Sequence, residues 1–498
     1  MFNKNFLLTI FAISGMTALI YEIAWIRPIS LVFGNTIYAV SIIIATFILG
    51  LAIGSYIAGR FIDKKDKPLR YYAFIQLGIG AYGVIIILLL SILPYLFTDN
   101  FALQMITIFT IIAIPTILMG MTLPIIVKTF SSEIKKIGSD VGKLDASQNI
   151  GAVVGVLVAG FLMIPILGIQ NTIITTAMIN VLVGLTLIIL LKESIRIKAI
   201  TAVIVIIVGM AFFFPIYDEK AMSYGIFANA NAIEIYQDSE TLFYEESAYS
   251  PVIIEQLKDF KVMKVGGRIQ CSDSADAISG LERLATKPIE LFYDKPKTSL
   301  VIGLGCGYTS QKLASFGYID VTTIELDPEV ARASKLFTDV PVIIDDGRKW
   351  LANSKKKFDI IITQPDHPHS GSWQLFTLEY FNLVNEHLTE NGVSAQWIPA
   401  TNMKLNDFYV TYNTFHEVFP YVYIYNLKEV GGHLIFIGSN VKLDATKERL
   451  YWGSYEKMVE HQTELSTDNK PLIEFATARN IYNPNPDEIF EELIKLRK

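Results

Sequence analysis

A glycine-rich turn at residues 303–307 is the clearest chemical signal in the sequence. It reads Gly303-Leu304-Gly305-Cys306-Gly307 and lies directly after an apolar strand and directly before a helix. Glycines in such a turn let the backbone bend tightly and approach a ligand. The third glycine follows the second by two residues, which differs from the dinucleotide fingerprint that places a pyrophosphate at a helix N-terminus. The spacing therefore favours a nucleoside without phosphates.

Acidic residues close the next two predicted strands. Glu325 ends the strand that follows the turn, where a carboxylate can bind ribose hydroxyls. Asp345 and Asp346 follow the third strand, and we expect one of the two to cap the helix that begins there. Together with the glycine turn, these carboxylates predict a nucleoside site.

A second group of chemically active residues follows the fourth strand, in Gln364-Pro365-Asp366-His367-Pro368. A glutamine amide cannot act as a base at neutral pH. Asp366 is the nearest carboxylate able to hold a cationic amine and accept its proton, and His367 is an alternative base. Three aromatic side chains could supply faces against which a cation packs, or could belong to the core: Tyr249, Trp373 and Trp397.

Regular alternation of strands and helices must position these residues. Short segments at about 232–236, 252–257 and 261–265 predict a small antiparallel β unit. After Pro296, strands and helices alternate, which predicts a parallel sheet with helices on both faces and chemistry at its carboxyl edge. The tail predicts an amphipathic helix to about residue 465, a short extended segment and a helix over 487–498 that together cover the sheet.

The first 216 residues have a different character. Hydrophobic residues make up 52% of the chain and charged residues 18%, and the apolar excess lies in seven runs long enough to cross a bilayer. We therefore predict a multi-pass transmembrane domain over 1–216 with about seven helices. A linker and small β domain over 217–295, a Rossmann-like nucleoside-binding domain over 296–443 and a C-terminal helical extension over 444–498 complete the expected organisation.

The basic residues of this region lie in alternate loops. They follow the second, fourth and sixth apolar runs, whereas the other loops hold almost nothing basic beyond Arg27. The positive-inside rule then places the N-terminus in the cytoplasm, and seven crossings place the C-terminal domain outside. A nucleoside cofactor, however, is made in the cytosol. The side of the C-terminal domain therefore stays open at this point.

Cysteine content and net charge exclude some classes of site. Cys271 and Cys306 are too few for a disulfide framework, and their spacing matches no zinc site, so no metal is expected. A net charge of −6 gives no basic footprint for nucleic acid.

Most of the chain resembles the membrane-fused subgroup of the spermidine synthase family of aminopropyltransferases. In the N-terminal part the resemblance rests on the segments 21–27, 50–60 and 142–168. In the C-terminal part it rests on the following motifs: Val265-Gly266-Gly267-Arg268-Ile269-Gln270, the 303–307 turn, Glu325-Leu326-Asp327, Asp346-Gly347-Arg348, Leu375-Phe376, Gln396-Trp397-Ile398-Pro399 and Thr467-Asp468-Asn469-Lys470-Pro471. The resemblance implies a class I methyltransferase-like Rossmann fold behind a small β domain.

The same resemblance implies roles for individual residues. Gln270 and the turn with Gly303, Gly305 and Gly307 would line the nucleoside site, and Glu325 would hold the ribose. Asp346 would read the adenine.

The positions implied for the amine differ from the family pattern. Gln364 stands where soluble members place the aspartate that takes the proton from the attacking amine, and His367 stands where a second aspartate grips the amine. Ser279 replaces a tyrosine of the amine pocket, and Cys306 replaces the acidic residue of the glycine turn. We therefore name Asp366, His367 and Gln364 as the candidate catalytic positions.

The expected reaction is transfer of an aminopropyl group from decarboxylated S-adenosylmethionine to an amine. Two alternatives remain open: another S-adenosylmethionine-dependent transferase such as a methyltransferase, and a non-catalytic nucleoside-binding sensor or transport element of the membrane. The expected partners are membrane lipid and a small amine or polyamine, with a homodimer left open and no nucleic acid. The expected location is the cell membrane.

Overall fold

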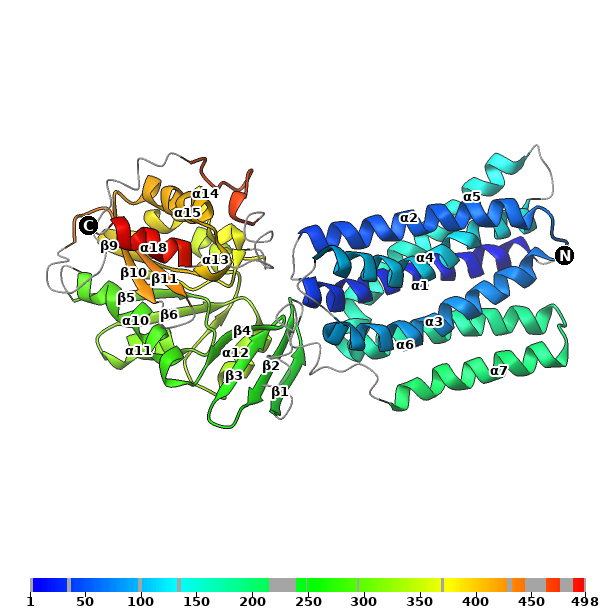
Figure 1. The fold of residues 1–498 in the computed structure, drawn as a ribbon, viewed down its shortest axis with the longest axis horizontal. Helices are drawn as coiled ribbons and strands as arrows, with labels where there is room; N and C mark the ends of the chain where they lie inside the picture. The colour runs from blue at the N-terminus through cyan, green and yellow to red at the C-terminus, as the bar shows by residue number, and fades with distance from the viewer. Residues whose placement is uncertain are drawn as a thin grey trace. The chain divides into compact units, whose positions relative to one another are not determined.

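The computed structural model describes residues 3–33, 37–96, 101–131, 136–214, 239–247, 249–292, 295–368, 371–427, 432–443, 463–474 and 487–496. The chain divides between residues 233 and 234 into two compact units (Figure 1). Each unit is described by itself.

The first unit contains seven α-helices within its described residues. They are α1 Lys4–Phe33, α2 Ile37–Ile62, α3 Pro68–Leu96, α4 Phe101–Phe130, α5 Ile137–Val158, α6 Ile164–Leu190 and α7 Ile195–Met210. A π-helical turn, Ala159–Met163, joins α5 to α6. Six stretches are long and apolar enough to cross a bilayer by length and composition, because the fifth runs unbroken from residue 137 to residue 190. That stretch contains the fifth and sixth predicted spans, which are separated by a kink where Gly168 adopts a φ of +72°.

Glycines allow close packing between helices of this unit. A Cβ at Gly151 would lie 1.9 Å from the carbonyl oxygen of Ala12, and one at Gly155 would lie 2.3 Å from that of Met16. Helices α1 and α5 therefore touch backbone to backbone, as small residues permit in apolar bundles.

The second unit begins with a four-stranded antiparallel sheet in the order β1-β2-β3-β4. Its strands are β1 Glu240–Glu246, β2 Pro251–Gln256, β3 Lys261–Val265 and β4 Arg268–Ser272. Strands β2 and β3 agree with the sequence prediction, whereas the strand expected at 232–236 lies outside the described residues. The prediction missed β1 and β4.

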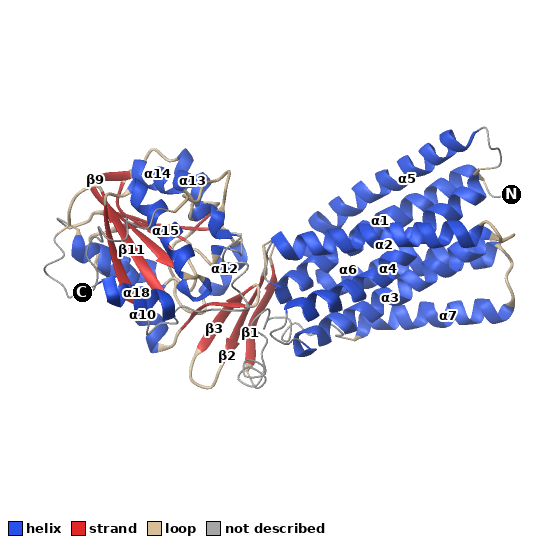
Figure 2. Ribbon diagram, turned by 45° about the horizontal axis from the view of Figure 1, so that its top comes forward, coloured by secondary structure: helices blue, strands red, loops and turns tan. Residues whose placement is uncertain are grey.

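A seven-stranded sheet in the order β10-β11-β9-β8-β5-β6-β7 follows (Figure 2). Its strands are β5 Thr298–Ile302, β6 Asp320–Glu325, β7 Ile343–Ile344, β8 Phe358–Thr363, β9 Leu388–Ile398, β10 Tyr421–Leu427 and β11 His433–Ser439. Strands β5 to β9 are parallel, as predicted, whereas β11 pairs antiparallel with both β9 and β10. Its helices are α10 Ala275–Leu291, α11 Tyr308–Ser315, α12 Pro328–Ser334, α13 Gly347–Asn353, α14 Leu378–Glu386, α15 Leu405–Val418 and α18 Asp487–Leu496.

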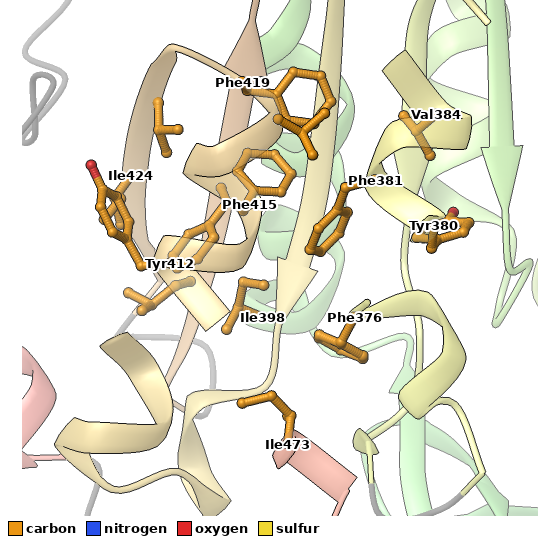
Figure 3. Packing of buried hydrophobic residues seen from close by; sticks show 14 of the residues in the cluster. Phe376, Tyr380, Phe381, Val384, Ile398, Tyr412, Phe415, Phe419, Ile424 and Ile473 are labelled. Carbon is orange, nitrogen blue, oxygen red and sulfur yellow. The ribbon is translucent and has the colours of Figure 1, made fainter. Parts of the chain in front are cut away.

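Two hydrophobic cores cover the two faces of this sheet. Alternate residues of a strand point to opposite faces, so Leu300 and Ile361 enter one core while Val301 and Ile360 enter the other. The first core joins the sheet to α13, α14, α15 and α18, and Figure 3 shows its aromatic centre, with Phe376, Tyr380, Phe381, Phe415 and Phe419 packed together. The second core joins the sheet to α10 and α11.

The C-terminal tail covers the sheet only in part within the described residues. Helix α18 buries Ile489, Phe490 and Leu493 in the first core, as expected for a cover. The helix predicted up to residue 465 falls almost entirely on 444–462, outside the described residues.

Candidate functional site

A cavity of about 710 Å³ opens at the carboxyl ends of strands β5, β6 and β8. Strand β5 lies between β6 and β8, so the chain order reverses there, which is where open α/β sheets bind ligands. The cavity has the size of a small-molecule site. The predicted site residues that line it are Gln270, Gly303, Gly305, Glu325, Asp346, Gln364, Asp366 and His367. Four other residues singled out in the sequence are not among the lining residues: Ser279, Gly307, Asp345 and Trp373.

The glycine turn requires glycine at all three positions. Gly303, Gly305 and Gly307 have φ values of +93°, +54° and +84°, which residues with a Cβ rarely adopt. A Cβ at Gly303 would lie 2.7 Å from the carbonyl oxygen of Gln364. Gly307 instead occupies the start of α11, where a Cβ would meet Thr338. Gly307 therefore lies behind the cavity lining, and its contact with the nucleoside stays a prediction.

Glu325 holds the turn from the end of β6. Its carboxylate accepts hydrogen bonds from the backbone N–H of Leu304 at 2.8 Å and of Asp327 at 2.9 Å. The side chain is buried, and burial raises the pKa of this carboxyl group although these N–H groups oppose the shift. Glu325 therefore lines the cavity as a carboxylate that the backbone keeps in place.

Asp346 is the capping residue of the pair that follows β7. Its side chain accepts a hydrogen bond from the backbone N–H of Lys349 at 2.7 Å and so caps α13. The same residue lines the cavity, whereas Asp345 pairs with the Lys349 ammonium group at 3.2 Å. Capping and lining are thus combined in one side chain.

Asp327 is a cavity residue that the sequence reasoning missed. It caps α12 through Glu329 and accepts a hydrogen bond from the Ser247 hydroxyl at 2.6 Å. Burial, with a smaller contribution from Glu329, raises the pKa of Asp327 to about 6. Its position two residues after Glu325 could have indicated that it also lies at the carboxyl end of β6.

Gln364 is committed to the glycine turn. Its side-chain Nε2 donates to the carbonyl oxygens of Gly303 at 2.5 Å and Leu304 at 3.1 Å, and its Oε1 accepts from the Thr309 hydroxyl at 2.7 Å. The amide thus joins the end of β8 to the turn. This geometry suits a positioning residue, and the role of Gln364 as a catalytic candidate stays a prediction.

Asp366 and His367 form a connected pair on the loop after β8. Asp366 Oδ1 accepts from the His367 backbone N–H at 2.7 Å and lies 3.1 Å from His367 Nδ1, while His367 Nε2 lies 3.1 Å from the Thr401 hydroxyl. The Ser372 hydroxyl donates to the carbonyl oxygens of both residues. The loop therefore holds a carboxylate and an imidazole in fixed mutual positions inside the cavity.

Arg268 of β4 faces this pair and was also missed. Its side chain is buried, and Nη2 lies 3.6 Å from Asp366 Oδ2. A buried guanidinium in a cavity can bind an anionic group of a ligand as well as a neighbouring carboxylate. The sequence analysis named Arg268 only as part of the 265–270 motif and gave it no role.

Aromatic rings complete this side of the cavity. Trp397 lies against the ring of His433, with ring centroids 4.8 Å apart, and Tyr249 lines the cavity with about half of its side chain exposed. Burial lowers the pKa of His433 to about 3, and the nearby His367 contributes to the same direction. His433 is therefore a neutral ring at physiological pH.

Cys271 and Cys306 form a disulfide in the cavity wall. Cys271 lies on β4 and Cys306 within the glycine turn, and their Cα atoms are 5.9 Å apart. Two cysteines are too few for a disulfide framework, as the sequence indicated, yet they pair with each other in a single bond. Thirty-five residues separate them along the chain, and only the packing of the small sheet against the turn brings them together.

Comparison with known proteins identifies the relatives of this chain. A family model described as "Spermine/spermidine synthase domain" matches residues 282–445. A polyamine aminopropyltransferase of Corynebacterium efficiens is 26% identical over 78% of this chain and 75% of its own length. Polyamine aminopropyltransferase 2 of Aquifex aeolicus is 21% identical over 95% of this chain and 93% of its own, which includes the helical unit.

Among solved structures, the spermidine synthase of Thermotoga maritima is similar with a TM-score of 0.38 at 22% identity, covering 51% of this chain and 88% of its own. The relatives named polyamine aminopropyltransferases are transferases. Residues 282–445 thus match a spermine/spermidine synthase domain, and most of the chain is similar to polyamine aminopropyltransferases.

Proposed function

We propose that this protein transfers an aminopropyl group from decarboxylated S-adenosylmethionine to an amine, with the nucleoside held by the glycine turn. The observation that carries the proposal is the clustering of acidic side chains around one cavity, because sulfonium and amine groups are both cations. Glu325, Asp327, Asp346 and Asp366 all line it. The relatives' names support the same reaction class.

The chemistry is a direct displacement at carbon. The lone pair of a neutral amine attacks the carbon next to the sulfonium, a C–N bond forms, and the C–S bond breaks with its electron pair moving to sulfur. Methylthioadenosine leaves, and the extra proton on nitrogen passes to a base. Because sulfonium is already a good leaving group, the protein needs mainly to position and desolvate the amine.

Asp366 is the residue proposed to hold the amine and accept its proton. It lines the cavity, and its backbone and side chain are fixed by Ser372 and His367. His367 orients this carboxylate through the 3.1 Å contact at Nδ1. Gln364 acts at a distance from the reacting atoms by keeping the turn in place.

Attachment to a membrane is part of the proposal. The helical unit supplies stretches that are long and apolar enough to cross a bilayer, and its helices expose large hydrophobic residues such as Ile48, Phe161 and Ile166. Lipid would cover these faces. The amine, the donor and lipid are then the expected partners.

The buried Arg268 favours a second candidate. A guanidinium has five N–H donors, so Arg268 can bind a carboxylate while it contacts Asp366. S-adenosylmethionine carries such a carboxylate and its decarboxylated form does not. Methyl transfer, or another reaction of the carboxylated donor, is therefore the alternative on the same nucleoside site.

Product analysis tests the proposal. Purified full-length protein in detergent is incubated with decarboxylated S-adenosylmethionine and putrescine, and methylthioadenosine and the extended amine are measured by mass spectrometry. We expect both products in equal amounts, and Asp366→Asn should abolish most of their formation. Formation of S-adenosylhomocysteine from S-adenosylmethionine instead would select the second candidate, and no product from either donor would reject both.

A further inference from the structure

One end of the helical unit collects its basic residues. Lys4, at the start of α1, pairs with Asp140 at 3.2 Å and lies over the ring of Phe130 at 4.5 Å, which brings the beginnings of α1 and α5 to the end of α4. Lys128 donates to the carbonyl oxygens of Ile62 and Lys65 at 2.7 Å each, so the end of α2 lies there too.

The last loop of the unit belongs to the same end. Arg70, at the start of α3, pairs with Glu193, which follows α6, at 3.3 Å. Helix α6 therefore runs back from Gly168 to this end, and α7 leaves it again. The amide of Gln170 at the opposite end donates to the carbonyl oxygen of Phe214 at 3.0 Å, which places the exit of the chain there.

The two ends differ sharply in charge. Every Lys and Arg between residues 3 and 214, apart from Arg27, lies in the N-terminal segment, in the loops that follow α2, α4 and α6, or in the helical turns beside them. In the sequence, the segments 34–36 and 97–100 contain no Lys or Arg, and neither do residues 168–171 at the kink of α6. In a bilayer the basic end faces the cytoplasm.

The second unit gives an independent indication. Its two cysteines, which are the only ones in the sequence, are joined in a disulfide in the cavity wall. Disulfides form and persist in oxidising compartments and are rare in the cytosol. After Phe214 the sequence contains no further apolar run long enough to cross the bilayer before Glu240, so the second unit stays on the side where α7 ends.

We propose that the nucleoside-binding unit works on the outer side of the membrane, with the Cys271–Cys306 disulfide formed there. The direction of all seven helices, the loop charge and the disulfide agree on this placement. It follows that a transport step must deliver the nucleoside donor to the outer face. The placement of the nucleoside-binding unit is independent of the proposed reaction. Its tests measure the accessibility of thiols, and they require neither donor binding nor turnover.

Thiol labelling of intact cells tests the placement. Two single-cysteine reporters are made in the Cys271→Ser/Cys306→Ser chain: Lys258→Cys, in the exposed turn between β2 and β3, and Lys64→Cys, in the exposed loop after α2. A membrane-impermeant maleimide is added before or after the cells are permeabilised. We expect Lys258→Cys to be labelled in intact cells and Lys64→Cys only after permeabilisation, whereas the reverse pattern would overturn the placement.

The unmodified chain provides a second measurement in case the serine variant does not fold. Membranes are prepared with N-ethylmaleimide present, reduced or left unreduced, and then treated with a polyethylene glycol maleimide in denaturant. We expect a gel shift of two adducts only after reduction. Absence of that shift, with both cysteines already blocked by N-ethylmaleimide, would show free thiols in the cell and overturn the proposal.

Discussion

The two walls of the cavity are built in different ways. The turn wall, made of Gly303, Gly305, Glu325 and Asp346, is held mainly by backbone contacts, since Glu325 accepts from two backbone N–H groups and Asp346 caps a helix. The loop wall, made of Arg268, Asp366, His367 and His433, is held largely by contacts between side chains.

From this difference we expect the turn wall to determine nucleoside binding and the loop wall to determine the reaction. Changing the turn wall alters the path of the backbone, so we expect it to remove nucleoside binding. Changing the loop wall leaves the backbone of the turn in place, so we expect it to alter turnover or the choice of donor. Each of the following substitutions separates binding from turnover, and together they test this division.

Gly303→Ala should have the largest effect. The added Cβ would combine a φ of +93° with a 2.7 Å approach to the Gln364 carbonyl oxygen, so the turn must move. A strained backbone position costs about 1–3 kcal/mol, so we expect the donor affinity measured by calorimetry to fall by about tenfold or more. Gly317→Ala is the matched control, because Gly317 has a φ of +70° with open space around it, and it should lose only about 1 kcal/mol of stability. Equal donor affinity in both variants would refute the role of the turn.

Asp366→Asn should reduce turnover without reducing donor binding. Loss of a general base typically lowers the rate by about a hundredfold or more, and we expect such a fall in kcat with the donor Kd changed less than about twofold. Asp345→Asn, which removes an exposed pairing with Lys349 outside the cavity, is the control and should leave kcat unchanged. A normal kcat in Asp366→Asn would remove this carboxylate from the mechanism.

Gln364→Asp should weaken the turn and should not improve catalysis. A carboxylate there would face the carbonyl oxygens of Gly303 and Leu304, to which the glutamine now donates. Leaving those acceptors unmatched costs about 1–3 kcal/mol, so the melting temperature and donor affinity should both fall, the latter by about tenfold. Gln364→Asn is as short as the aspartate variant but keeps the amide, so it should be the more stable of the two in thermal unfolding. If the aspartate variant instead turned putrescine over faster, Gln364 would be part of the reacting site.

The pH dependence of donor affinity should give the smallest effect. The pKa of Asp327 is about 6, so its carboxylate ionises as the pH rises through 6 and should strengthen binding of a cationic donor by about threefold to tenfold. The ionisation of Asp327 has the opposite effect on the stability of the folded protein. The folded pKa lies above the unfolded one, so the contribution of Asp327 to stability is present below about pH 4 and is lost as the pH rises through 6. Calorimetric titrations with the donor from pH 5 to pH 7 should show the rise in donor affinity, and Asp327→Asn should make the affinity nearly independent of pH in this range. A rise that persists in that variant would assign the effect to another group.

Much of the turn wall could be predicted from the sequence because its signals are local. The strand before Gly303, the positive-φ glycines and the acids that end β6 and β7 all follow from short-range pattern and spacing. In the loop wall, Asp366 and His367 were named from their place after the fourth strand. Arg268 and His433 were not, because their place in the cavity depends on which side chains meet across the fold. Nothing in the spacing of Cys271 and Cys306, or of Arg268 and Asp366, shows that β4 packs beside the turn and the loop after β8. The orientation of Gln364 toward two carbonyl groups was equally invisible.

Calorimetric titration of the purified full-length protein in detergent tests the central claim most directly. Decarboxylated S-adenosylmethionine is titrated into the protein, and S-adenosylmethionine is then used as the competitor. The proposed aminopropyl transfer predicts tighter binding of the decarboxylated form. Tighter binding of S-adenosylmethionine would contradict it and assign Arg268 to the donor carboxylate, and failure to bind either compound would contradict the nucleoside site itself.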